Sequence, residues 1–454
     1  MATTTIDPKD SAFFYASRPG HSTDHYITTA LQHGNGRSTT EDLTAQIRSR
    51  VSRVVALRAR LSAPALHLDY PSWVHRTAPL DDDVVVHDVP GGTWSRAASV
   101  LGSVLASPLD SERSSWRVHV LPELQGVPCS SGSADVVVVQ ISHCLTDGSG
   151  AVALTRFLLG DDASFDEVPA PEIGEPHSRA VAALRGVGRV PGQVVGIVSD
   201  VVRSLRSSRD FSRRLAVGTV TARPPARRPT MFNDDPGNDR VAHVVVRSRD
   251  AVTTVAGTRV SVTAASLTVV ARAMALFLRE QGLDVPRDLG AHVTMALPPN
   301  ASWSGVNRLA AANVDLCPLA TGPREQTDGI AASLAAERVR GTHPAVLDAV
   351  RVADHLPAPL LRWGIRRSEP DRSTASAHTT VSSVRCGAND LEIADRHSLF
   401  MTAFAALSPT DGLNHTVFGL GDTIAFGVLT SAVSVPQHRR YVDILSTVLD
   451  ELAG

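Results

Sequence analysis

The sequence predicts an α/β protein built from two large domains. The chain has 454 residues, which is more than one ordinary hydrophobic core accommodates. The clearest structural unit is 135–160, where a valine run, a short polar loop and an amphipathic segment follow one another. β-branched residues in an unbroken apolar run favour a strand that is buried on both faces. The unit therefore predicts a strand, a sharp turn and a helix.

The strand of this unit ends beside a histidine. His143 follows it, and Asp147 and Gly148 lie in the turn. A neutral imidazole on a rigid element beside a loop is suited to remove a proton near pH 7. Asp147 would either orient the imidazole or fold the turn, by accepting backbone N–H groups or by pairing with an arginine. Gly148 predicts a bend that a side chain would obstruct. The alternative is a core histidine and a loop aspartate without a catalytic role.

Composition excludes several classes of protein. The net charge is −2 and 43% of the residues are hydrophobic, which favours a soluble globular protein and gives no charge argument for nucleic-acid binding. Lys9 is the only lysine among 44 basic residues, a bias that fits a GC-rich coding sequence. The four cysteines form no CxxC pair, and His21 and His25 lack a third ligand nearby, so neither disulfides nor a metal site is expected.

The N-terminal half alternates further predicted helices and strands. Thr39 and Thr40 are candidate caps for a helix, since acidic residues follow them. The predicted elements are a loop over 10–26, a helix over 39–61, short strands within 71–89 around a solvated acidic turn at 81–83, a helix over 94–106, and strands 117–121 and 135–141 that pair as a hairpin.

Segment 178–216 is strongly basic, with eight arginines against Asp200 and Asp210. Its apolar residues between Val194 and Leu205 share one helical face. Two interpretations stay open: an interdomain crossover helix, or an amphipathic helix resting on an anionic membrane. The apolar face is narrow and has no aromatic anchor, so weak, salt-sensitive membrane association is the most that we expect. A proline-rich linker follows, and a strand over 241–246 begins the second domain.

Three segments of the N-terminal half occur in a recognisable order. They read WVHRTAPLDDDVVVHDV from Trp73, PLDSERSSW from Pro108 and SHCLTDG from Ser142. They resemble the wax ester synthase/diacylglycerol acyltransferase family of the CoA-dependent acyltransferase superfamily. Four later segments are also similar to this family: the helical block 257–282, the strand 312–319, the segment 378–395 and the terminal hairpin 414–428.

The resemblance covers nearly the whole chain and implies an architecture. It implies two chloramphenicol-acetyltransferase-like open-sheet domains that form a pseudo-dimer, with a central tunnel that reaches His143 from both ends. We accordingly divide the chain into an N-terminal acyltransferase domain (1–177), a crossover helix and linker (178–240), and a C-terminal acyltransferase-like domain (241–454).

Several positions depart from the family pattern. Ser142 replaces the first histidine of the HH pair, and Thr263 and Ala264 stand where the family has asparagine and aspartate. Ser383 replaces an asparagine, and positions 385 and 386 replace a proline and a glycine. His143, Asp147 and Gly148 are kept. From the resemblance we take Ser142, Thr263 and Ser383 as candidate substrate-binding or oxyanion residues; the alternative for Thr263 is a helix cap.

The resemblance implies acyl transfer. His143 would remove the proton of an alcohol or amine, which attacks the thioester of an acyl-CoA or acyl-carrier protein; the imidazolium then protonates the leaving thiolate. No metal or permanently bound cofactor is needed. We expect an O-acyltransferase first, in the cytoplasm or peripherally at a membrane. The altered motifs favour a natural-product condensation or tailoring enzyme over a lipid synthase. The alternative outside the enzymes is a catalytically weakened lipid- or carrier-binding scaffold protein.

Overall fold

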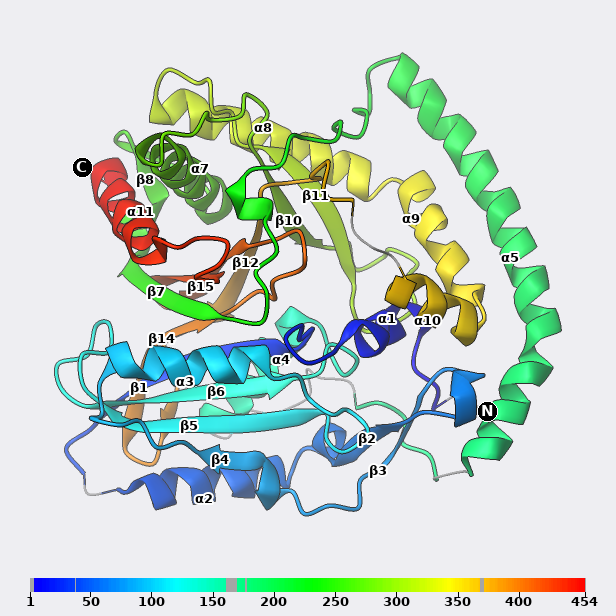
Figure 1. The fold of residues 1–454 in the computed structure, drawn as a ribbon, viewed down its shortest axis with the longest axis horizontal. Coiled ribbons are helices and arrows are strands. Elements are labelled where there is room, and N and C mark those ends of the chain that lie inside the picture. The colour runs from blue at the N-terminus through cyan, green and yellow to red at the C-terminus, as the bar shows by residue number, and fades with distance from the viewer. Residues whose placement is uncertain (1–3, 37, 161–169, 176–177, 368–370, 454) are drawn as a thin grey trace.

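The computed structural model describes residues 4–36, 38–160, 170–175, 178–367 and 371–453. Two six-stranded sheets with helices against them form two halves that lie one on the other (Figure 1). The helices of the described residues are α1 (Pro8–Ala16), α2 (Thr40–Val51), α3 (Trp94–Ala106), α4 (Gly148–Leu159), α5 (Arg179–Ala216), α6 (Arg249–Thr253), α7 (Val262–Glu280), α8 (Pro323–Gly341), α9 (Pro344–Arg351), α10 (Ala358–Arg367) and α11 (His438–Ala453).

The strands fall into two large sheets and two short ladders. The first sheet has the order β13 (Glu392–Ile393), β14 (Arg396–Ala403), β1 (His25–His33), β6 (Ala134–Ile141), β5 (Trp116–Leu124), β4 (Val84–Val86). The second has the order β11 (Leu309–Asp315), β10 (Gly290–Ala296), β12 (Thr379–Gly387), β15 (Leu413–Leu420), β16 (Thr423–Thr430), β7 (Val241–Ser248). The ladders are β2 (Ala59–Ser62) with β3 (Ser72–His75), and β8 (Thr254–Val255) with β9 (Thr258–Arg259).

The predicted strand, turn and helix unit is confirmed as β6 and α4. Every residue of β6 is buried, as its valine run indicates. The predicted hairpin is confirmed as well: β5 and β6 run antiparallel, with Trp116 opposite Ile141. Helix α3 has the predicted bounds, and the C-terminal hairpin is β15 and β16.

Three local predictions were wrong. Segment 10–26 is not all loop, because α1 begins at Pro8 behind an Asp7 cap and carries residues 10–16 as a helix. Helix α2 starts behind the predicted Thr39 cap but ends at Val51; the apolar residues after it enter a 3₁₀ turn and β2. The acidic turn at 81–83 is not fully solvated, since Asp83 is buried and pairs with Arg76.

Strand β14 crosses from the C-terminal part of the chain into the first sheet. It pairs antiparallel with β1, between β1 and β13. Arg396 of β14 and Asp135 of β6 form an ion pair with Nε to Oδ2 at 2.5 Å, and both side chains are buried. The segment assigned to the C-terminal domain from sequence therefore contributes two strands to the N-terminal sheet.

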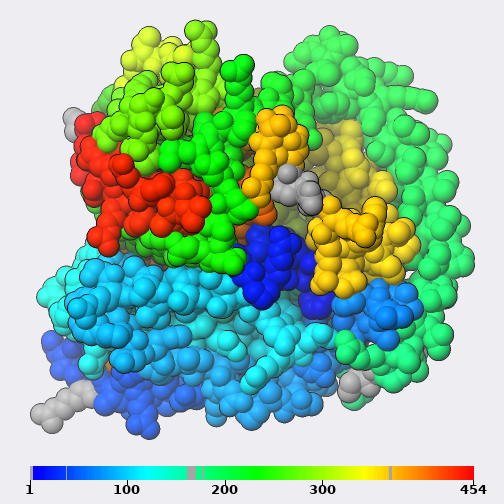
Figure 2. Space-filling model, viewed as in Figure 1, coloured from blue at the N-terminus to red at the C-terminus, as the bar shows by residue number. Residues whose placement is uncertain are grey.

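The two halves share a hydrophobic core. Tyr26, Val136 and Val138 of the first sheet pack in one cluster with Val244 and Leu429 of the second. Figure 2 shows the N-terminal segment, in dark blue, inserted between the lower and the upper half beside α10. Residues from both halves and from α1 therefore meet at this boundary.

Helix α5 runs along one side of the molecule and spans both halves (Figures 1 and 2). It is tied down through polar contacts such as Arg189 with Asp69 and Asp200 with His355. Its valine face is exposed to solvent, with Val195 71% exposed and Val198 59% exposed. The helix thus bridges the halves without burying its apolar stripe.

Helix α7 is the one helix among the described residues that is long and apolar enough to cross a bilayer. Of its most apolar stretch, 72% is buried inside the second half, where α7 packs against α8 and α11. Its composition is accounted for by this place in the core.

Candidate active site

His143 lies at the boundary between the two halves. β6 ends at Ile141, and the turn that follows brings the imidazole between two other rings. Phe13 of α1 stacks on it with ring centroids 4.3 Å apart and planes at 12°. His25, the first residue of β1, lies at 3.5 Å with planes at 37°. The two neighbours fix the plane of the half-buried imidazole.

A hydrogen-bond network fixes which ring nitrogen carries the proton. Asn307 Oδ1 lies 3.0 Å from His143 Nδ1. Asn307 Nδ2 donates to Asp10 Oδ1 at 2.8 Å and to the His143 carbonyl oxygen at 2.7 Å. Because both partners of the NH₂ group accept only, the amide oxygen must face the imidazole. His143 therefore donates from Nδ1–H, and its Nε2 keeps the lone pair.

The surroundings keep the imidazole neutral. Burial lowers the pKa of His143 to about 4, although the hydrogen bond to Asn307 and the charge of Asp147 act in the opposite direction. Burial, followed by the neighbouring His143, also holds the pKa of His25 well below its usual value. His25 Nε2 lies 3.1 Å from the Thr146 carbonyl oxygen and donates to it. Both histidines are thus uncharged near neutral pH.

Asp147 folds the turn through backbone groups. Its Oδ1 accepts from Ser149 N and Gly150 N, both at 3.0 Å, which caps α4. The predicted arginine partner is not found: no ion pair to Asp147 occurs within the described ranges. The prediction for Gly148 was also wrong, because a Cβ atom there would meet nothing closer than His25 Cε1 at 3.9 Å. At Gly150 a Cβ atom would lie 1.8 Å from Thr146 Oγ1. The position where a side chain would obstruct the turn is therefore Gly150.

Two cavities flank His143. The first, of about 490 Å³, is lined by His143, His25 and Gly148 together with Ser382 and Ser383 of β12. The second, of about 470 Å³, is lined by Asn307, Asp10 and Phe13 together with residues of β11, α8 and α9. Leu309 borders both. Phe13 and Asn307, which both contact His143, line the second cavity, whereas His143 itself lines the first.

The other predicted site residues lie in different places. Ser383 lines the 490 Å³ cavity, and Thr263 Oγ1 donates to Ser383 Oγ at 3.4 Å. Thr263 does not cap its helix, since Ser261 accepts from Ala264 N in that role. Ser142 is buried, accepts from Ser111 and from Cys144 N, and lines neither cavity. Of these three residues, only Ser383 therefore lines a cavity together with His143, and Thr263 contacts Ser383.

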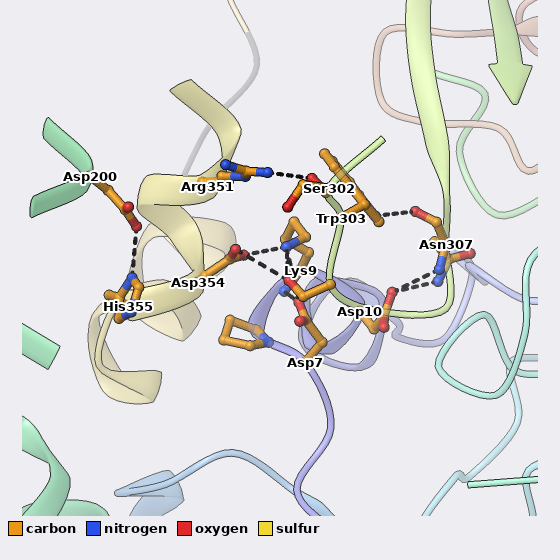
Figure 3. Close-up of polar contacts among 12 residues, drawn as sticks. Asp7, Lys9, Asp10, Asp200, Ser302, Trp303, Asn307, Arg351, Asp354 and His355 are labelled. Atoms are coloured by element: carbon orange, nitrogen blue, oxygen red, sulfur yellow. Dashed lines mark hydrogen bonds and ion pairs between the residues drawn. The ribbon is translucent and has the colours of Figure 1, made fainter. Parts of the chain in front are cut away.

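A wider polar network supports the Asn307 side (Figure 3). Trp303 Nε1 donates to the Asn307 carbonyl oxygen at 2.9 Å, and Lys9 Nζ lies 4.7 Å above the Trp303 ring. Lys9 also contacts Asp354 and Ser304. These contacts join α1 to the loop before β11 and to the 3₁₀ turn Val352–His355 after α9.

Asp10, Phe13 and Asn307 were not identified as site residues from sequence. Asn307 stands just before β11, in a segment that sequence analysis matched to the family only from residue 312. Asp7 followed by Pro8 is a helix-start signal that would have predicted α1 and placed Asp10 and Phe13 one turn apart.

Solved structures with this fold are acyl-transferring and condensing enzymes. One is the wax ester synthase/diacylglycerol acyltransferase from Marinobacter aquaeolei VT8, with 17% identity over 99% of this chain and 98% of that chain, and a TM-score of 0.63. Another is the starter condensation domain of rhizomide synthetase in complex with C8-CoA and Leu-SNAC, at 12% identity over 99% and 95%, with a TM-score of 0.54. A third is the first condensation domain of the CDA synthetase, at 14% identity over 100% and 97%, with a TM-score of 0.53. At these identities the likeness establishes the fold.

Sequence families establish the class. The wax ester synthase/diacylglycerol acyltransferase catalytic domain matches residues 6–269, and the C-terminal domain of the same family matches 306–453. No curated protein sequence matches the chain. The chain is an acyltransferase, and it belongs to the wax ester synthase/diacylglycerol acyltransferase family.

Proposed function

We propose that this acyltransferase moves an acyl group from a CoA thioester to a hydroxyl group, with His143 Nε2 as the general base. The observation that carries the proposal is the hydrogen bond between His143 Nδ1 and Asn307. Because Nδ1 is occupied, Nε2 is the nitrogen left for a substrate in the 490 Å³ cavity. In the reaction, Nε2 takes the hydroxyl proton as the oxygen attacks the thioester carbon. The imidazolium then returns that proton to the departing CoA thiolate.

Ser383 is our candidate for stabilising the oxyanion. Thr263 donates to Ser383 Oγ, so the hydrogen of the Ser383 hydroxyl is left to point into the cavity. A hydroxyl donor of this kind stabilises the charge that develops on the thioester oxygen. Thr263 does not contact the substrate in this proposal; its hydrogen bond orients the Ser383 hydroxyl.

The cavity favours an alcohol over an amine. Asp24 is the acidic residue among its lining groups, and its Oδ2 already accepts from Leu109 N, Ser22 Oγ and Gln140 Nε2. Burial raises the pKa of Asp24 to about 6. The Oδ2 atom of Asp24 is therefore occupied by protein donors and is not left to bind a protonated amine, whereas a neutral alcohol needs no carboxylate.

The same lining offers an acceptor several polar groups within mainly apolar walls such as Ile27, Phe404 and Phe418. Thr294, Thr380, Ser382 and Ser383 bring hydroxyl groups to the cavity. Polar groups that line a pocket select partners that can hydrogen-bond with them. We therefore propose a small acceptor with several polar groups, as a natural-product tailoring enzyme would use. The donor is proposed as CoA because a starter condensation domain of this fold is known in complex with C8-CoA.

We also propose that the protein works in the cytoplasm, with weak contact to membranes at most. The open valine face of α5 and its arginines are the features that would meet an anionic surface.

A thiol-release assay tests the proposed reaction. The protein is mixed with an acyl-CoA series and with panels of polar alcohols, fatty alcohols and amines, and free CoA is measured. We expect release with polar alcohols and a loss of roughly 10²–10⁴-fold in His143→Ala, the usual scale of general-base catalysis. His397→Ala is the matched control, because His397 is exposed on β14 outside the site. Full activity of a folded His143→Ala protein, or release only from acyl-carrier protein, would contradict the proposal.

A further inference from the structure

Two hydrogen bonds, through the side chain of Asn307, connect the carboxylate of Asp10 to His143 Nδ1. We propose that Asp10 and Asn307 are positioning residues which hold His143 in the tautomer that leaves Nε2 unprotonated. The inference rests on the proposed role of His143 as the base. It assigns a function to two residues from parts of the chain that are 297 positions apart.

The first step concerns the amide of Asn307. Its NH₂ group lies 2.8 Å from Asp10 Oδ1 and 2.7 Å from the His143 carbonyl oxygen. Turning the amide over would set its oxygen against these two acceptors, and an oxygen has no hydrogen to donate to either of them. The orientation that presents Oδ1 to His143 Nδ1 is therefore the one that satisfies every group.

The second step concerns Asp10, which is buried. Its Oδ2 accepts from Val306 N at 2.8 Å, and its Oδ1 accepts from Asn307 N at 3.3 Å as well as from the Asn307 side chain. Gly305 allows this approach, since it has φ +84° and a Cβ atom there would lie 2.7 Å from Asp10 Oδ2. All the contacts to the carboxylate are from N–H donors, so it must accept with both oxygens.

The third step identifies which partner can change. Backbone N–H groups always donate, whereas a side-chain amide can turn over. A carboxylate at position 10 accepts on both sides and fixes the Asn307 amide. An amide at position 10 has a single oxygen, which accepts either from Val306 N or from the two N–H groups of Asn307. When the oxygen accepts from Val306 N, which is the shorter of the two backbone contacts, the NH₂ group of residue 10 faces Asn307. Asn307 would then turn over and donate to Nδ1, which moves the imidazole proton to Nε2.

The substitution Asp10→Asn tests this chain of contacts. The measurement is ¹⁵N NMR of labelled histidine, with the His143 resonances assigned by their loss in His143→Gln. We expect wild-type His143 to be protonated on Nδ1 and the variant to gain the Nε2–H form. Turnover should fall roughly 10²-fold, the low end of a general-base contribution, with KM changed much less.

Asp7→Asn is the matched control. It makes the same change of atoms on the same helix, and asparagine replaces aspartate well as a helix cap. It should leave both the tautomer and the turnover as in the wild type. If helix α1 acted only by packing, the two variants would resemble each other in their melting behaviour and neither would alter the tautomer.

Two results would overturn the proposal. One is a wild-type His143 that carries its proton on Nε2; the other is a folded Asp10→Asn protein with unchanged tautomer. Should Asp10→Asn fail to fold, Asn307→Ala removes the acceptor directly and must yield a mixture of both tautomers.

The pH profile of turnover is a second readout. The titratable groups that face His143 are Asp147, His25 and, through Asn307, Asp10. An active His143→Ala protein would contradict the proposed role of His143 as the base. An unchanged tautomer in Asp10→Asn would contradict only the positioning role of Asp10, so the two failures can be told apart.

Discussion

On the Nε2 side of His143 the protein keeps a cavity lined by Ser382, Ser383 and Thr380, whereas on the Nδ1 side Asn307, Asp10 and Trp303 bond one another in a closed network. The first side brings hydroxyl groups to a cavity that a substrate can enter. The second side satisfies its polar groups within the protein, which makes it rigid. The imidazole of His143 is therefore oriented through Nδ1 by groups of the protein, which leaves its Nε2 side to the first cavity.

The largest difference in turnover is expected when one serine is replaced by alanine on each side of His143. Ser383→Ala should lower turnover by roughly 10²-fold, the lower range for the loss of one oxyanion donor. Ser376→Ala, in the cavity beyond Asn307, should leave turnover unchanged because that cavity does not contact His143. Steady-state thiol release decides between them, and equal effects would show that the two sides are not distinct.

The pH dependence of the rate tests the lowered pKa of His143. Its pKa of about 4 means that Nε2 stays unprotonated at pH 5, so kcat should fall less than twofold there. An imidazole with the ordinary pKa of about 6.5 would lose roughly 30-fold at pH 5. A stopped-assay rate profile between pH 4 and pH 8 measures this, and an acid limb near 6.5 would contradict the assignment.

Stability must be followed in the same experiment. Burial also lowers the pKa of His119 to about 4 and of His415 to about 3. The unfolded chain takes up these protons first as the pH falls below about 6.5, so the free energy of unfolding decreases between pH 6.5 and pH 4. Circular dichroism at each pH separates this loss of fold from protonation of the base.

Asp147 distinguishes a structural aspartate from an electrostatic one. Because its Oδ1 caps α4, Asp147→Ala should cost about 1 kcal/mol of unfolding free energy, while Asp147→Asn keeps the cap and most of that stability. Urea denaturation measures the difference. An Asp147→Asn protein with normal stability and a displaced pH–rate profile would instead place Asp147 in the electrostatics of His143.

The smallest effect is expected at α5, the outer support of the Nδ1 side. Asp200 of α5 holds His355, next to the Asp354 that contacts Lys9. The exposed valines and the arginines of α5 should give weak binding to anionic liposomes at low salt and none at high salt. Vesicle flotation measures it. Binding that survives high salt would indicate buried apolar contact and would favour a lipid substrate.

The sequence was most informative where one pattern determines one element. The valines of β6, the glycine-rich turn and the periodicity of α4 each agree with one local structure, so that unit could be predicted with its histidine. The resemblance to the family supplied the second half and its hairpin. Both predictions depend on residues close together in the chain.

The Nδ1 side could not be predicted because it depends on tertiary contacts. Asp10 and Asn307 meet only after α1 docks against the loop before β11, and no local pattern marks a buried aspartate as a partner of an asparagine. The crossing of β14 was missed for a similar reason: its antiparallel pairing with β1 joins strands that lie far apart in sequence. In the sequence, Arg396 has the character of a surface residue; only the fold brings it to its buried ion-pair partner Asp135.

The single lysine has a chemical consequence for an enzyme that handles thioesters. A neutral amine attacks an activated acyl group, whereas a guanidinium stays protonated and does not. Lys9 has 10% of its side chain exposed and forms an ion pair with Asp354, so its amine is shielded from solvent. The arginines that carry the remaining basic charge offer no such nucleophile. Acylation of lysine side chains by a thioester donor is therefore limited to this one shielded amine.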